Sequence, residues 1–289
     1  MNVDAEKLRI IAAESLGKGK WQDATDLFRA AVVLDGYSFE RLIDESLDLM
    51  RGGKLAQGDE LSDLAVEHDL NRAKSHYLSL KWEEDEVILQ SLAKLCYIDE
   101  DDEAMFRYSK AAVKINNSNA PCVALLAASD RCVTGAVVGE GYDNLTSAAV
   151  RWDPGNRLAV LIRIEFCLEV ANVYQNSVGI DLELLEKFSD EDGVITVQSD
   201  HDYYRVSDIL YAIEVSAEQL SEASPLILKA LNASCKEGGW YRGHAIASAN
   251  LALGYYYDCG MLHECNSLHK ELLQIAPNDF EEELEDQIG

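Results

Sequence analysis

Apolar and small side chains recur along this chain with the three- and four-residue steps of an α-helix. From Trp21, steps of three, four and three residues lead to Ala24, Phe28 and Ala31, which share one helical face. The same spacing returns in segments that begin at Leu55, Asp101 and Leu262. Four segments in one register predict a repeated helical unit.

Each of these segments follows another helical pattern, and a short turn joins the two. The turns carry Gly19, Gly53, Asp99 and Gly260, residue types that tolerate a tight turn or a helix C-cap. Small residues in the second helix let two helices cross closely, because a long or β-branched side chain would push the axes apart. We therefore predict that these positions are packed: Trp21, Ala24, Phe28, Ala31, Gly58, Ala65, Ala104, Tyr108, Ala111, Leu272 and Pro277.

The first two units are offset by 34 residues, and each has small residues at the second and fourth packed positions, Ala24 and Ala31 in the first and Gly58 and Ala65 in the second. In this period and these small residues the chain resembles the tetratricopeptide repeat family, whose period is 34 and whose packed positions are small, small, aromatic and small. This resemblance implies an all-α fold in which helical hairpins stack into a right-handed α-α superhelix with a concave inner face. Repeats are expected at about 5–38, 39–72 and 85–118, with a degenerate fourth at 120–155, which together form a region of repeats over 1–155.

The rest of the chain follows the repeat less closely. Residues 71–82 are left over between the second and third repeats and predict an extra helix or an extended turn. Residues 156–240 are helical in pattern but off the repeat, with an acidic loop at 189–202. Residues 241–289 are interpreted as a C-terminal repeat followed by an acidic tail. One continuous solenoid is the expected arrangement.

The composition is typical of a folded helical protein, and the net charge limits the classes of partner that we expect. Hydrophobic residues make up 48% of the 289 residues, and only 4 are proline, which favours helices over a β-sandwich or barrel. The formal charge of -27 repels phosphates and anionic lipids, so neither nucleic acid nor a membrane is an expected partner. The same acidity also fits a purely solubilising surface, or adaptation to a salty cytoplasm.

The 7 cysteines form an odd set, and most lie in apolar helical stretches, as buried thiols do in a reducing compartment. The chain begins without a signal-peptide pattern, and no apolar run approaches the roughly 18 residues of a membrane helix. A cytoplasmic location is therefore expected.

Motifs for catalysis are not found. The sequence has no Gly-rich phosphate loop, no Gly-x-Ser-x-Gly elbow and no His-Glu-x-x-His helix. Its densest His and Cys group, Cys259, His263, Cys265 and His269, places two members at packed repeat positions, so packing is favoured over a metal site. We expect no catalytic residue, no metal and no cofactor.

The resemblance implies that the first helix of each repeat lines a groove for a peptide or a partner protein. The residues implied as groove-lining are Glu6, Arg9, Ala13, Leu16, Ile43, Leu47, Met50, Glu86, Leu89 and Ala93. The leading hypothesis is a non-catalytic interaction scaffold or adaptor whose ligand is neutral or basic. One alternative is a secretion- or assembly-type chaperone for a basic partner.

Another alternative is a small-ligand sensor or an enzyme with a pocket in residues 156–240. That hypothesis predicts that His201, Tyr203, Tyr204 and Arg205 converge in a closed cavity. The sequence leaves the partner's identity and the oligomeric state open.

Overall fold

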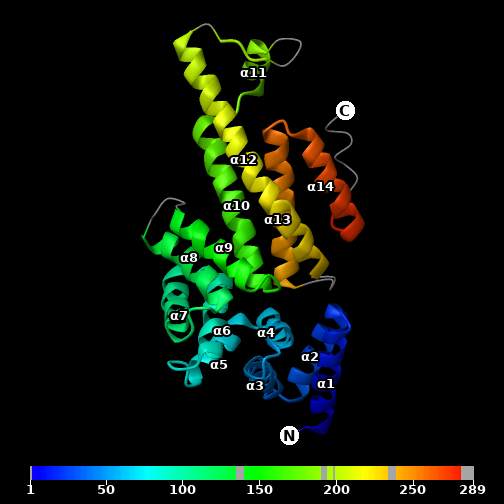
Figure 1. The fold of residues 1–289 in the computed structure, drawn as a ribbon. Coiled ribbons are helices and arrows are strands. Elements are labelled where there is room, and N and C mark those ends of the chain that lie inside the picture. Colours follow the sequence, from blue (N-terminus) through cyan, green and yellow to red (C-terminus); the bar gives the residue numbers. More distant parts are fainter. Residues whose placement is uncertain (1, 135–139, 190–193, 198, 234–238, 281–289) are drawn as a thin grey trace. The chain divides into compact units, whose positions relative to one another are not determined.

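The helical periodicity of the sequence is realised throughout the part of the chain that can be described (Figure 1). The computed structural model describes residues 2–134, 140–189, 194–197, 199–233 and 239–280. These residues form fourteen α-helices and no β-strand, which confirms the all-α prediction. None of these helices has an apolar stretch long enough to span a lipid bilayer.

The chain divides into two compact units. Unit 1 comprises residues 1–162 and 234–244, and unit 2 comprises residues 163–233 and 245–289. The first nine helices belong to unit 1: α1 (Val3–Gly17), α2 (Trp21–Leu34), α3 (Ser38–Arg51), α4 (Leu55–His68), α5 (Leu70–Ser79), α6 (Glu86–Ile98), α7 (Asp102–Ile115), α8 (Ala120–Thr134) and α9 (Glu140–Trp152). The remaining helices are α10 (Arg157–Val178), α11 (Leu182–Phe188), α12 (Asp200–Ala233), α13 (Trp240–Asp258) and α14 (Leu262–Ile275). Unit 1 includes the first residues of α10 and α13.

In unit 1 consecutive helices pack as antiparallel hairpins, α1 with α2, α3 with α4, α6 with α7 and α8 with α9 (Figure 1). The turns of the first two hairpins place Gly19 and Gly53 at φ 77° and 80°, where a side chain is strained. The third turn places Glu100, not Asp99, in this region, at φ 56°. The residues left over between the second and third hairpins form helix α5, the first of the two predicted outcomes.

Helices α3 and α4 cross closely at Gly58. A Cβ added at Gly58 would lie 2.5 Å from Cγ of Met50 and 2.6 Å from the backbone oxygen of Ser46. The Ser46 hydroxyl donates a hydrogen bond of 2.7 Å to the Gly58 carbonyl across the same contact. Glycine is therefore required here by the spacing of the two helices.

Replacing Gly58 by alanine is expected to destabilise the protein by about 1–3 kcal/mol, because the new methyl group overpacks the α3–α4 contact. In an open helical site the same change stabilises by about 0.5–1 kcal/mol. Gly254 of α13 is such a site, since a Cβ there meets nothing within 4 Å. Denaturant midpoints of Gly58→Ala and Gly254→Ala should therefore move in opposite directions, and a stabilised Gly58→Ala protein would contradict the close contact.

The predicted packed positions lie mostly in the interior. Burial is nearly complete at these positions: Trp21, Ala24, Phe28, Ala31, Gly58, Ala65, Tyr108 and Leu272. Ala104 and Ala111 are half-buried and pack against the core of unit 1, whereas Pro277 is exposed. The small residues thus pack around large buried ones such as Phe28, whose ring centroid lies 6.1 Å from that of Phe39.

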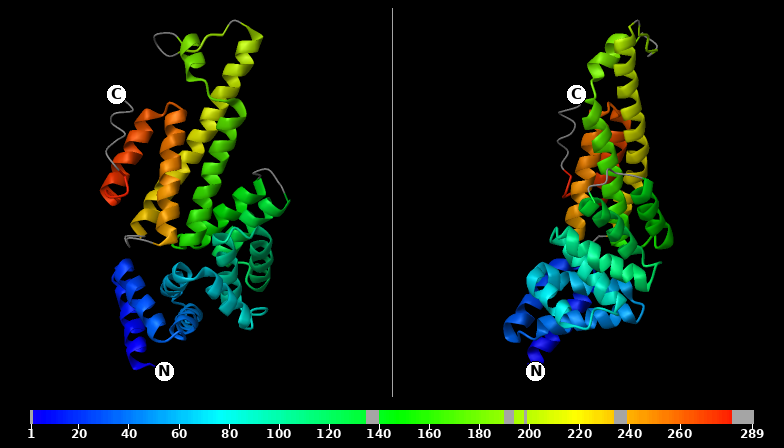
Figure 2. Two further views of the ribbon diagram at one scale, coloured as in Figure 1. Left: turned by 180° about the vertical axis from the view of Figure 1, so that it is seen from behind. Right: turned by 90° about the vertical axis from the view of Figure 1, so that its left-hand side faces the viewer.

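In unit 2 the long helices α10 and α12 run side by side, as both views of Figure 2 show. The guanidinium of Arg163 in α10 donates two hydrogen bonds of 2.7 Å to Glu222 of α12. Farther along, the rings of Tyr174 and Tyr211 meet edge to face at 5.8 Å. In the described part of the acidic loop predicted at 189–202, Ser189 and Ile195 form an isolated antiparallel bridge, and α12 begins at Asp200. Residues 190–193 and 198 of this loop, and residues 281–289 of the predicted acidic tail, lie outside the described residues.

Candidate functional site

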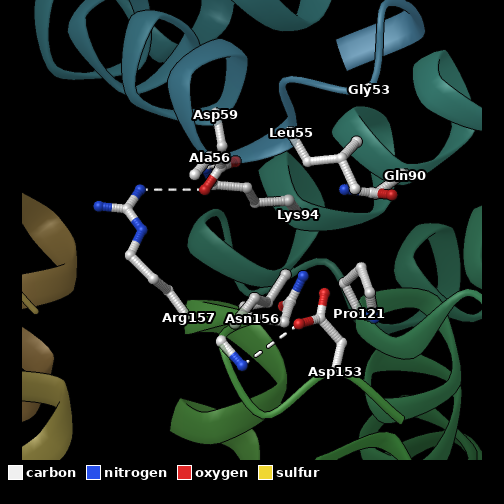
Figure 3. Close-up of a pocket in the computed structure, with 12 residues that line it drawn as sticks. Gly53, Leu55, Ala56, Asp59, Gln90, Lys94, Pro121, Asp153, Asn156 and Arg157 are labelled. Atoms are coloured by element: carbon white, nitrogen blue, oxygen red, sulfur yellow. Dashed lines mark hydrogen bonds and ion pairs between the residues drawn. The ribbon is translucent and has the colours of Figure 1, made fainter.

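A polar cavity of about 310 Å³ lies in unit 1 between α4, α6, α10 and the start of α8 (Figure 3). Twelve residues line it: Gly53, Leu55, Ala56, Asp59, Gln90, Lys94, Pro121, Asp153, Gly155, Asn156, Arg157 and Leu158. Its lining combines two carboxylates, two cations and two amides with a few apolar side chains. Such a surface can bind polar groups of either sign.

The turn before α10 fixes one wall of this cavity. Asn156 caps the helix, because its side-chain oxygen accepts the N–H of Ala159 at 3.0 Å. The Asp153 carboxylate accepts the N–H of Gly155 at 3.2 Å (Figure 3). Helix α10 therefore begins at Arg157, whose side chain reaches toward α4.

Four charged side chains meet beside the cavity, and we call them the ion cluster: Asp59, Asp63, Lys94 and Arg157. The ammonium of Lys94 lies 2.5 Å from Asp59 and 2.6 Å from Asp63. The guanidinium of Arg157 lies 3.0 Å from Asp59 and 2.7 Å from Asp63. Asp63 and Lys94 are nearly fully buried, with exposed side-chain fractions of 2% and 5%. Each carboxylate is thus neutralised by two cations.

The cluster favours the charged forms of Asp59, Lys94 and Arg157. Burial raises the pKa of Asp59, but the charges of Lys94 and Arg157 outweigh burial and lower it to about 2. Burial lowers the pKa of Lys94, but the two carboxylates raise it above its ordinary value. The pKa of Arg157 is raised for the same reason. Lys94 is therefore an ammonium group and an ion-pair partner, and its amine is not available as a nucleophile.

The segment that begins α13 covers the ion cluster within unit 1. The indole N–H of Trp240 donates to Asp63 at 2.8 Å, and its backbone N–H donates to Glu67 at 2.6 Å. The Lys94 ammonium lies 5.3 Å from the centre of the Trp240 ring, within cation–π range. A similar contact places the Arg157 guanidinium 5.0 Å from the Tyr241 ring. The sequence gives no local signal for this contact, because residues 63 and 240 are far apart along the chain.

A second feature of unit 1 is a row of three hollows of about 370, 390 and 350 Å³ along α3, which we call the α3 groove. The first hollow is lined by Ile10, Ala13, Glu14, Leu16, Gly17, Glu45, Leu49, Gln57, Glu60 and Leu61. The second is lined by Arg9, Arg41, Asp44, Glu45, Asp48 and Leu49. The third is lined by Asp44, Leu47, Asp48, Arg51, Leu80, Lys81, Asp85 and Ile88. Neighbouring hollows share lining residues, so the three lie next to one another along α3.

Only part of the predicted groove faces this row. Arg9, Ala13, Leu16 and Leu47 line it, although Leu16 and Leu47 are almost fully buried. The remaining apolar members of the prediction lie in the core of unit 1: Ile43, Met50, Leu89 and Ala93.

The physical reason is the orientation of α3 and α6. Their apolar stripes are buried in unit 1, so the groove is lined by the adjacent face. On α3 that face carries Asp44, Asp48 and Arg51, a charged stripe at helical spacing. This charged stripe is the pattern in the sequence that could have predicted which residues of α3 line the groove.

The two predicted acidic residues make intramolecular contacts. Glu6 accepts a hydrogen bond from Arg9 at 3.3 Å. Glu86 accepts hydrogen bonds from Asn116 at 2.9 Å and from Asn119 at 2.5 Å. Arg9 also pairs with Glu45, and both side chains line the second hollow.

The four side chains hypothesised to converge in a pocket of residues 156–240 lie at the surface. His201, Tyr203, Tyr204 and Arg205 are exposed in the first turns of α12. The Arg205 guanidinium pairs with Asp181 at 3.1 Å on the surface. These side chains therefore belong to an open face of unit 2.

The Cys and His candidates near the C-terminus lie in α14 and in the turn that joins it to α13. Cys265 and His269 are buried on α14, and Cys259 is buried at the end of α13, where it accepts a hydrogen bond from Gln175 at 3.1 Å. Burial raises the pKa of the Cys265 thiol. Within the described ranges, no group of three or more His, Cys, Asp or Glu side chains could hold a metal ion.

Comparison with known proteins gives little further information. No protein-family profile and no curated protein matches the chain. A crystal structure from Bacteroides ovatus ATCC 8483, described as a "putative protein binding protein", has a TM-score of 0.37 and 10% sequence identity to this chain. The match covers 76% of this chain and 99% of that one. A TM-score of this size supports no inference about family or function.

Proposed function

We propose that this chain is a non-catalytic scaffold or adaptor that binds a segment of a partner protein in the α3 groove. The observation that carries the proposal is the adjacency of the three hollows along α3, which offers an extended surface for one ligand. An extended groove suits a peptide or a helix of a partner, whereas a small substrate needs a site that encloses it.

The lining of the α3 groove defines the chemistry of this partner. Ile10, Leu49 and Leu80 provide apolar contacts. Charged residues surround them, with six acidic positions (Glu14, Asp44, Glu45, Asp48, Glu60 and Asp85) and four basic ones (Arg9, Arg41, Arg51 and Lys81). The partner segment is therefore neutral or basic, with apolar side chains between its polar ones. The charge of -27 argues against nucleic acid and anionic membranes and is in keeping with a cytoplasmic protein partner.

The proposal includes a tetratricopeptide-like architecture, in which the hairpins of unit 1 stack as a right-handed superhelix. Two features support it. The left-handed residues Gly19, Gly53 and Glu100 occupy equivalent places in three hairpin turns. The 34-residue offset between Trp21 and Leu55 reappears as the offset between the first residues of α2 and α4.

Site-specific photo-crosslinking tests the proposal. A benzophenone side chain at Leu49, which lines two of the three hollows, is expected to capture a partner protein in a lysate of the native cells. The same group at Val33 of α2, where the native side chain is 86% exposed, serves as the surface control and is expected to capture nothing specific.

A second test reverses charges in the α3 groove. Asp44→Lys with Asp48→Lys reverses two charges on the lining, and we expect the Leu49 cross-link to fall at least about tenfold through repulsion of a basic partner. Reversal of two exposed acids away from the groove, Asp23→Lys with Glu103→Lys, leaves the net charge equal to that of the groove variant and should keep the cross-link. Equal capture from Leu49 and Val33, or equal loss in both charge-reversal proteins, would overturn the proposal.

A further inference from the structure

The acidity of the chain is concentrated in unit 2. This unit holds 23 of the 52 acidic residues and 5 of the 25 basic ones, which gives it a formal charge of -18 out of -27. Eight of these acidic residues lie on the two long helices α10 and α12. Between Arg205 and Lys229, helix α12 carries four acidic residues and no basic one. The α3 groove lies in unit 1 and makes no use of this charge.

Two large aromatic side chains stand on the solvent face of α12 among these acids. Tyr204 and Tyr211 are 68% and 56% exposed. They are seven residues apart, which is about two helical turns, so they lie on one face. Exposed acids at helical spacing continue that face, namely Asp208, Glu214 and Glu218. We call these five residues the tyrosine–acid stripe.

The rings of the stripe are held by neighbouring rings. Tyr204 contacts the exposed Tyr203 ring edge to face at 5.9 Å. Tyr211 contacts Tyr174 of α10 edge to face at 5.8 Å. These contacts limit the rotation of each ring while leaving a large part of it in water, so little conformational entropy is lost when a ligand covers it.

We propose that the tyrosine–acid stripe binds an arginine-rich segment of a partner protein. Guanidinium groups stack on the faces of tyrosine rings and form paired hydrogen bonds with carboxylates. Along this stripe tyrosine rings and carboxylates lie close to one another, so one arginine-rich segment can use both. A lysine ammonium also pairs with the carboxylates, but it is more strongly hydrated and stacks less well on an aromatic ring. Preference for arginine over lysine at equal charge is therefore the signature of this surface.

The test uses fluorescein-labelled nona-arginine and nona-lysine and the full-length chain, with binding followed by fluorescence anisotropy. For the wild type we expect nona-arginine to bind at least about fivefold more tightly than nona-lysine at moderate salt. In Tyr204→Ala with Tyr211→Ala this difference is expected to disappear, because the residual attraction is purely Coulombic.

A matched control removes two exposed tyrosines elsewhere. Tyr37, in the turn before α3, is 74% exposed, and Tyr257 of α13 is 47% exposed. Tyr37→Ala with Tyr257→Ala keeps the net charge of the chain. This protein should retain the arginine preference, and circular dichroism should be unchanged in both double variants. Equal affinity of the wild type for the two peptides, or equal loss in the two double variants, would overturn the proposal. Neither result bears on the α3 groove, which lies in the other unit.

Discussion

Lys94→Met should destabilise the protein by about 3–5 kcal/mol, the expected cost of removing one partner from a buried ion cluster. Lys94 lies within 2.6 Å of both Asp59 and Asp63. Methionine fills a similar volume without the charge, so the two carboxylates are left to share the guanidinium of Arg157. Urea denaturation followed by circular dichroism measures the loss as a shift of the midpoint.

The same substitution should change the response to acid. The pKa of Asp59 is lowered from 3.8 to about 2 in the folded protein, so its contribution to stability is present above about pH 4 and is lost as the pH falls through about 2. Lys94→Met raises that pKa. The difference in free energy of unfolding between the two proteins should therefore be largest near neutral pH and shrink below about pH 4.

Two further variants separate the ion cluster from a general effect of lost lysine. Lys81 is exposed, so Lys81→Met should change stability by no more than about 0.5 kcal/mol. Adding Asp59→Asn to Lys94→Met removes the surplus negative charge and should recover part of the loss. If Lys94→Met were as mild as Lys81→Met, the four charges would not form a coupled cluster.

The sequence predicts the helices of unit 1 well because their signals are local. Steps of three and four residues and the turn residues Gly19 and Gly53 lie within single hairpins, and the structure places the corresponding turns at both sites. Residues 71–82 could not be resolved between a helix and an extended turn, since their apolar pattern is short. The side chain that secures α5 is Tyr77, which is fully buried and lies 3.0 Å from the Ser62 hydroxyl, a contact between two helices.

The candidate sites were less predictable because they depend on contacts between distant segments. Leu89 and Ala93 lie on the first helix of a repeat, where the resemblance implies groove positions, but they are buried in the core. Which face of a helix is buried depends on all the helices that pack against it. Only when the buried face is known does the charged stripe beside it indicate which residues line the groove. The contact of Trp240 with Asp63 spans 177 residues, and no pattern in either segment indicates it.

Trp240→Ala is the second substitution with a large expected effect. The change removes the indole that contacts Asp63 and Lys94 and the ring contact with Tyr97, whose centroid is 6.3 Å away. Complete removal of a buried tryptophan side chain costs about 3–5 kcal/mol, and the half-burial of Trp240 places the expected value near the lower end. Thermal and urea unfolding should both show this loss of stability. Amide hydrogen exchange over residues 240–244 should also become faster.

Trp240→Phe separates the hydrogen bond from the packing. Phenylalanine keeps an aromatic ring over Lys94 but has no N–H for Asp63, so about 1.5–3 kcal/mol is expected from the lost charged hydrogen bond. Trp152 of α9 is 53% exposed, and Trp152→Ala should cost no more than about 0.5 kcal/mol. Because the indole N–H and Lys94 both neutralise Asp63, Trp240→Phe and Lys94→Met should not add in the double variant. If the stability losses of the two single variants added exactly in the double variant, Trp240 would pack beside the ion cluster without stabilising its charges.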